Sequence, residues 1–135
     1  MTAREFLGQY EIALKRAQRL QTQIDDLRSK SEGLTEMQLE DRVQTTHRPD
    51  RMEELVAKMT DLRLEYASAE AEALGTMLEV QSVITQVPDN ELEMLLWYRY
   101  IRLMKWEDIS AEMHYEHTWI HALHHRALDE VEKLI

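Results

Sequence analysis

The chain has 135 residues, a length that suits one domain or one domain with an extension. Ala, Glu, Lys, Leu and Arg make up nearly half of it, whereas it contains only 3 Gly and 2 Pro. This composition is typical of long helices and coiled coils. It argues against a β-sandwich, a barrel or a doubly wound sheet, because each of these folds needs many turns. No Gly-rich phosphate loop is present, so neither a Rossmann nor a P-loop nucleotide site is expected.

The net charge is −10, from 16 Lys and Arg against 26 Asp and Glu, so the chain as a whole is not attracted to polyanions. The absence of cysteine excludes disulfides and thiol chemistry. No signal peptide and no run of ~18 apolar residues is found, so the sequence predicts a cytoplasmic protein that does not enter a membrane. No nucleophile stands beside a base, so we expect neither an enzyme nor a cofactor.

The first predicted helix covers residues 3–30, where apolar residues recur at alternating spacings of four and three. Such an a/d seam marks the face of a helix that packs against another helix. Thr2 is the predicted N-cap, and Glu5 completes a capping box. Residues 31–50 lose the pattern and contain Gly and Pro, so we expect a mobile connection there. The seam consists of Phe6, Tyr10, Ala13, Ala17, Leu20, Ile24 and Leu27.

The second predicted helix covers residues 51–87 and ends before Pro88. Two long helices with one apolar seam each must pair with each other, with a second copy, or with both. We expect an antiparallel, coiled-coil-like hairpin that also forms a homodimer, so that residues 1–87 are the oligomerisation region. The small residues Ala67, Ala69, Ala71 and Ala73 would let backbones approach closely. The seam consists of Met52, Leu55, Met59, Leu62, Tyr66, Ala69 and Ala73, followed by Met77, Val80, Ile84 and Val87 after a one-residue stutter.

Residues 88–135 form a second predicted region, which holds all three Trp and three of the five Tyr. Asp89 or Asn90 is the expected N-cap of its first helix. Trp106 and Tyr100 occur at helical spacing and are predicted to belong to its core. Three shorter helices fit this region, over about 90–103, 106–113 and 117–134.

The last two of these helices have the spacing of a helix-turn-helix. Ile109 and Met113 are apolar residues of the first helix, and Ile120 and Leu123 are apolar residues of the second. Tyr115 is expected to pack inside the turn between them. This spacing lets a short helix brace a longer one that can enter a major groove. The predicted fold class is therefore all-α: a long helical hairpin followed by a small C-terminal helix-turn-helix module.

Three short motifs in this module carry a resemblance to a known family. They are Arg99-Tyr100-Ile101, Lys105-Trp106-Glu107-Asp108-Ile109 and Leu123-His124-His125-Arg126-Ala127-Leu128. The module resembles region 4 of bacterial sigma factors. More closely, it resembles a family of small phage and prophage proteins of unknown function, related to late transcription activators of the RinA and ArpU type. The resemblance is specific from about Leu92 onward, and it implies DNA binding through the last helix in a bacterial host cell.

The exposed face of the last helix is the predicted DNA-binding surface. At 100° per residue, a buried stripe forms on one side from Ile120, Leu123, Ala127, Val131 and Leu134. We predict DNA contacts from Thr118, His121, Ala122, His125 and Arg126, and a partner contact from Trp119. The opposite face has no Lys or Arg, Arg126 lies to its side, and 88–135 holds five basic and ten acidic residues. Because phosphate neutralisation supplies most non-specific affinity, DNA binding should be weak at neutral pH.

Five of the six histidines lie between residues 114 and 125, and three interpretations stay open. They are a solvated face with a family-type His124, a contact face that gains charge near pH ~6, and a metal site. His117, His121 and His125 would form either of the last two, because the i, i+4 spacing can chelate one ion. No HExxH pattern and no cysteine supports a metal site, so no metal is predicted.

These observations favour a phage-type transcriptional regulator that binds promoter-like duplex DNA and contacts RNA polymerase or another regulatory protein. An alternative is an acidic, oligomeric protein–protein interaction module that has lost DNA binding. A third is a small packaging adaptor that reads phage DNA, although in such adaptors the DNA module usually precedes the oligomerisation helices. The missing basic residues favour the second function, whereas Arg99, Lys105, His124 and Arg126 favour the first.

Overall fold

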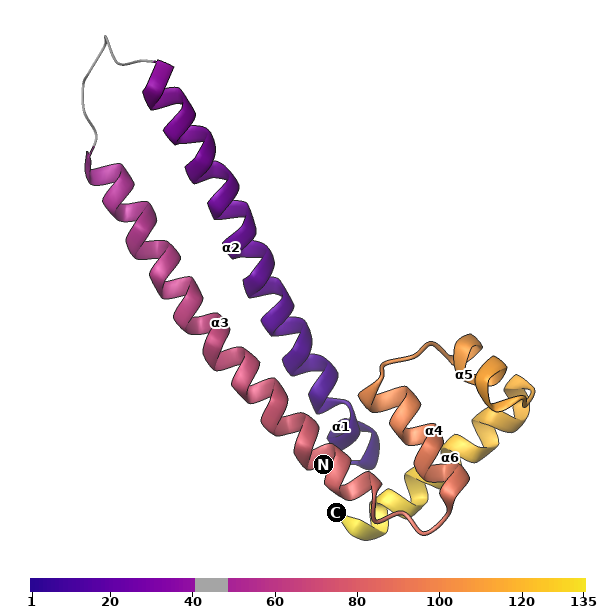
Figure 1. The fold of residues 1–135 in the computed structure, drawn as a ribbon. Coiled ribbons are helices and arrows are strands. Elements are labelled where there is room, and N and C mark those ends of the chain that lie inside the picture. Colours follow the sequence, from indigo (N-terminus) through magenta and orange to yellow (C-terminus); the bar gives the residue numbers. More distant parts are fainter. Residues whose placement is uncertain (41–48) are drawn as a thin grey trace. The chain divides into compact units, whose positions relative to one another are not determined.

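The computed structural model describes the backbone of residues 1–40 and 49–135, with side chains for 1–33 and 51–135. All regular structure in this part of the chain is helical, which confirms the all-α fold class (Figure 1). The helices form two compact units: the terminal unit, Met1–Leu14 with Glu72–Ile135, and the central unit, Lys15–Ala71. The elements are α1 (Ala3–Leu7), α2 (Gln9–Glu40), α3 (Pro49–Ile84), α4 (Asn90–Leu96), the π-helix η1 (Trp97–Ile101), α5 (Trp106–Met113) and α6 (His117–Leu134).

The chain begins with the predicted capping box. Thr2 Oγ1 accepts a hydrogen bond from the Glu5 N–H at 3.2 Å, and Glu5 Oε2 accepts one from the Thr2 N–H at 3.3 Å. Gly8 then separates α1 from α2, where the sequence indicates one continuous helix. A capped first turn satisfies amide groups that the helix itself leaves without partners.

α2 extends past its predicted end at residue 30 and reaches Glu40, so residues 31–40 of the expected connection are helical. A glycine inside a helix costs only about 1 kcal/mol relative to alanine, so Gly33 does not end it. α3 begins at Pro49, a position that proline favours because the first turn needs no N–H partner there. Residues 41–48 of the expected mobile connection lie outside the described residues.

In the central unit, α2 and α3 lie side by side (Figure 1). Ala17 and Leu20 of α2 are buried together with Ala69 of α3, and Leu62 and Tyr66 pack against this cluster. All five residues belong to the predicted seams, so the alternating three- and four-residue spacing correctly identifies the faces that meet.

The terminal unit has a core to which α1, α3, α4, α5 and α6 all contribute. The Ala3 N–H donates a hydrogen bond to Glu132 Oε1 at 2.6 Å, which ties the start of the chain to α6. Burying one aliphatic side chain contributes about 1.5–3 kcal/mol, so this cluster is the main source of stability for the unit. Its buried residues are Ala3, Leu7, Val80, Ile84, Val87, Leu92, Leu95, Leu96, Ile109, Ile120, Leu123, Ala127 and Val131.

The segment predicted as one helix over 90–103 is divided in two. Asp89 caps α4, since its Oδ1 accepts a hydrogen bond from the Glu91 N–H at 2.9 Å. After α4 the helix widens into η1, so that the Arg102 N–H donates to the carbonyl of Trp97 at 3.0 Å. Leu103 follows with a left-handed φ of 55°. The spacing of apolar residues is too coarse to reveal the single extra residue that widens a helical turn.

α3 ends at Ile84, before the predicted end at residue 87. The amides of Gln86 and Val87 donate to the carbonyls three residues earlier, at 3.0 and 3.1 Å, so the chain leaves the helix in tight turns. Val87 is nevertheless buried, as its place in the seam indicates. Among the described helices, none is both long and apolar enough to cross a membrane.

Candidate nucleic-acid interface

α5 and α6 are joined by a three-residue turn whose first residue bends the chain sharply. His114 has φ 59° and ψ 39°, in the left-handed region, and its N–H donates to the Ser110 carbonyl. Ser110 Oγ donates to the Tyr115 carbonyl, and the Tyr115 N–H donates to the Ser110 carbonyl at 3.2 Å. These bonds satisfy the Ser110 carbonyl in the last turn of α5 and set the direction in which α6 begins.

α6 is buried on one side, largely as its periodicity predicts. Ile120, Leu123, Ala127 and Val131 are almost completely buried. Leu134 is 39% exposed, so its predicted place in the stripe is wrong: it is the last residue of the helix. The buried stripe fixes α6 against α4 and α5, and it therefore fixes which side of the helix faces outward.

The outward side of α6 carries the predicted contact residues. Trp119 is 48% exposed, and its ring meets the ring of Tyr115 edge-on, with 6.2 Å between the centroids. Tyr115 Oη donates to Glu91 Oε1, and this hydrogen bond raises the pKa of the tyrosine. The turn and the Trp119 ring are thereby connected to α4. The five residues predicted for DNA contact are exposed as well: Thr118, His121, Ala122, His125 and Arg126.

His124 does not belong to this outward side. It is only 5% exposed, and its Nε2 forms a hydrogen bond with Tyr100 Oη of η1 at 2.7 Å. Burial lowers the pKa of His124 to about 4, with smaller contributions from the positive charges of Arg4 and Arg99. Burial likewise raises the pKa of Tyr100. His124 is therefore a neutral core residue at physiological pH, which its place in the sequence does not reveal.

Trp106 connects the buried histidine with the exposed face, a role that sequence reasoning missed. Its ring meets His124 edge-on at 4.7 Å and lies 5.4 Å from His121. The Arg99 guanidinium lies over the same ring at 4.4 Å, and its Nη1 donates to the Met104 carbonyl at 2.9 Å. Trp106 packs against the core as predicted, although it is only half-buried. The arrangement holds α5, η1 and α6 together behind the exposed face.

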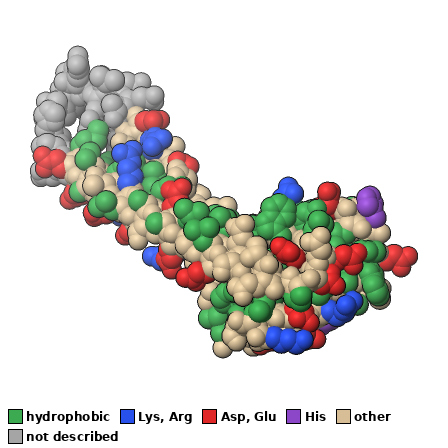
Figure 2. Space-filling model, turned by 60° about the horizontal axis from the view of Figure 1, so that its bottom comes forward, with side chains coloured by type: hydrophobic (Ala, Val, Ile, Leu, Met, Phe, Trp, Pro, Cys, Tyr) green, Lys and Arg blue, Asp and Glu red, His purple; other side chains and the backbone are tan. Residues whose placement is uncertain are grey.

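The charge of this surface is poorly suited to a polyanion at neutral pH. On the face that Figure 2 shows, acidic and apolar side chains lie among the basic ones. Glu112, Glu116 and Asp129 are exposed close in sequence to the predicted contacts, among which Arg126 is the one Lys or Arg. In the part of the chain that the structure describes, no three His, Cys, Asp or Glu side chains gather to hold a metal ion.

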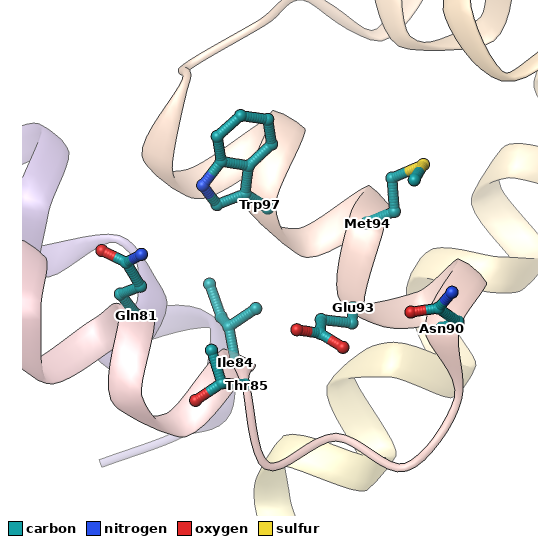
Figure 3. Close-up of a pocket in the computed structure, with 7 residues that line it drawn as sticks. All are labelled: Gln81, Ile84, Thr85, Asn90, Glu93, Met94 and Trp97. Atoms are coloured by element: carbon teal, nitrogen blue, oxygen red, sulfur yellow. The ribbon is translucent and has the colours of Figure 1, made fainter.

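A second feature of the terminal unit is a hollow of about 280 Å³ between α3 and α4 (Figure 3). Ile84 of α3 forms an apolar part of its wall, and Glu93 of α4 points toward Ile84 and Thr85. Met94 and Trp97, which also line it, are exposed apolar side chains. Sequence periodicity places these residues on helices but not beside a common hollow. Its complete lining is Gln81, Ile84, Thr85, Asn90, Glu93, Met94 and Trp97.

Comparison of the chain with protein-family models, curated proteins and solved structures found no match.

Proposed function

We propose that this protein is a transcriptional regulator that binds duplex DNA through the exposed face of α6, in a helix-turn-helix formed by α5 and α6. The observation that carries the proposal is the three-residue turn with a left-handed His114, followed by a helix that is buried on one side only. A helix braced in this way leaves its free face available to a major groove. The sigma-like motif around Lys105 and Trp106 supports a role in transcription.

The side chains on this face are chemically able to read bases. Thr118, His121, Ala122 and His125 follow the spacing i, i+3, i+4, i+7 and are all exposed. Threonine and histidine form hydrogen bonds with base edges, and the alanine methyl group can pack against a thymine methyl group. Arg126, beside them, is placed for a phosphate contact, which would position the helix without specifying sequence.

Histidine is the residue type on this face through which pH can act, because its side chain can change charge between pH 5 and 8. His114, His117, His121 and His125 are exposed, whereas His124 is buried with its pKa at about 4 and adds almost no charge at pH 6. We expect affinity for duplex DNA to rise about tenfold from pH 7.5 to pH 6 at low salt.

The test is selection of sequences from random duplex DNA at both pH values, followed by titration of the enriched sequence with single variants. Arg126→Ala should weaken binding several-fold, whereas Arg102→Ala, which removes the same charge from an exposed position after η1, should not. Equal effects of the two variants on affinity would mean that DNA binding depends only on the net charge of the protein. That result, or no enrichment at either pH, would exclude DNA reading by α6.

The hollow beside Met94 and Trp97 favours a second function, docking onto a basic segment of another protein. An apolar side chain could enter the hollow while a neighbouring Lys or Arg pairs with Glu93, a complementarity that suits a chain of net charge −10. A synthetic helical peptide with one Leu flanked by lysines is the probe. It should bind the protein, and Glu93→Lys should shift the preference to the matching peptide flanked by glutamates. If Glu93→Lys left the preference between the two peptides unchanged, the hollow would be excluded as the docking site.

A further inference from the structure

The part of α3 that lies in the central unit has a second apolar face, separate from the one that meets α2. The covered face contains Leu62, Tyr66 and Ala69. At 100° per residue, the second face lies about 160° around the helix from it. Its residues are Val56, Ala57, Thr60, Leu64, Ala67 and Ala71, all of them exposed. Val56 is 60% exposed and Leu64 is 67% exposed, so no described part of the chain covers them.

This second face has the spacing of a coiled-coil seam. Ala57, Thr60, Leu64, Ala67 and Ala71 alternate by three and four residues, and in the sequence the spacing continues to Leu74 and Leu78. The one polar member is already satisfied, because Thr60 Oγ1 donates to the Val56 carbonyl of its own helix at 3.0 Å. A seam of this kind on a helix that already packs on α2 indicates a further helical partner.

We infer that this face of α3 pairs with the same face of a second copy of the chain, antiparallel and related by a two-fold axis between residues 65 and 66. In that register Leu64 of each copy faces Ala67 of its partner, and Thr60 faces Ala71. A large side chain thus meets a small one at each step, which allows the two backbones to approach closely. The same patch serves both copies, as a two-fold interface requires.

The charged side chains beside this face of α3 favour a second copy of the chain as its partner. Arg63 and Glu70 flank the seam on the same side and are both exposed. In the antiparallel register Arg63 of each copy lies beside Glu70 of the other, so the axis generates two pairs of opposite charge. The central unit, residues 15–71, holds ten basic and twelve acidic residues, so most of the net charge of −10 lies elsewhere in the sequence. Repulsion between two copies is consequently small along this face.

The inference does not rest on DNA binding, and the mass of the full chain in solution tests it. Light scattering should give about twice the monomer mass of 16.1 kDa. Arg63→Glu and Glu70→Arg should each weaken the dimer about tenfold, because like charges then face each other, and the double variant should restore it. Lys58→Glu is the matched control: it makes the same charge change at an exposed position outside the seam, and should leave dimerisation unchanged.

Orientation is tested with introduced cysteines, which are unique because the chain has none. Mixing Thr60→Cys with Ala71→Cys should give a disulfide-linked heterodimer under oxidation, whereas Ala71→Cys alone should not cross-link with itself. Circular dichroism would show that every variant keeps its helical content. The inference is overturned if the chain is a monomer at all concentrations. It is also overturned if the charge substitutions leave the affinity of the dimer unchanged, or if Ala71→Cys cross-links with itself.

Discussion

The buried imidazole of His124 makes the stability of this protein depend on pH in a way that can be calculated. Its pKa falls from 6.5 in the unfolded chain to about 4 in the folded protein, chiefly because burial disfavours the charged form. As the pH falls, the unfolded chain therefore binds the proton first. The stability associated with neutral His124 is fully present above pH 6.5 and is lost as the pH falls toward 4. The loss is about 2 kcal/mol at pH 5 and about 3 kcal/mol at pH 4.

Urea unfolding followed by circular dichroism at pH 7.5, 6.5, 5.5 and 5 measures this loss. His124→Gln removes the titrating ring but keeps a polar side chain beside Tyr100. We expect wild type to lose about 2 kcal/mol more than His124→Gln between pH 7.5 and 5. His117→Gln, which changes an exposed histidine of the same helix that does not act on the pKa of His124, should lose as much as wild type. If nuclear magnetic resonance showed the His124 ring titrating near pH 6.5 in the folded protein, the reasoning would be refuted.

Three further substitutions test the local structure through the free energy of unfolding. His114→Gly should stabilise the protein by about 1 kcal/mol, because glycine adopts φ 59° without the penalty of a side chain; His114→Val should destabilise it. Gly75→Ala should raise the free energy of unfolding by about 1 kcal/mol, since a Cβ at this helical position meets no neighbouring part of the chain within 4 Å. A lower free energy of unfolding would show that the site is more crowded than the structure indicates. Leu95→Ala should cost about 3 kcal/mol, because Leu95 is completely buried in the terminal unit, and a cost below 1 kcal/mol would contradict that burial.

The sequence by itself determined that the chain is helical, the approximate position of most helices and the faces on which they pack. Thr2 with Glu5 marked one N-terminus, and Asp89 or Asn90 a second, where the structure has Asp89 as the cap. The three- and four-residue spacings identified the meeting surfaces of α2 and α3. The outward side of α6 was also predictable, including the exposure of Thr118 and Trp119. These features depend on residues within a few turns of one another, so local spacing and capping chemistry are enough to predict them.

Only the tertiary structure decided which of the clustered histidines are available for contact. His124 is neutral because Tyr100 of η1, Trp106 of α5 and the core of the terminal unit enclose it, and Arg4 of α1 adds to the effect. The π-helix after Leu96 and the hollow beside Trp97 likewise depend on elements that are distant in the sequence. Burial is set by what packs against a side chain from elsewhere in the chain. A periodicity read along one helix therefore predicts its exposed face but not the electrostatic environment of each residue on it.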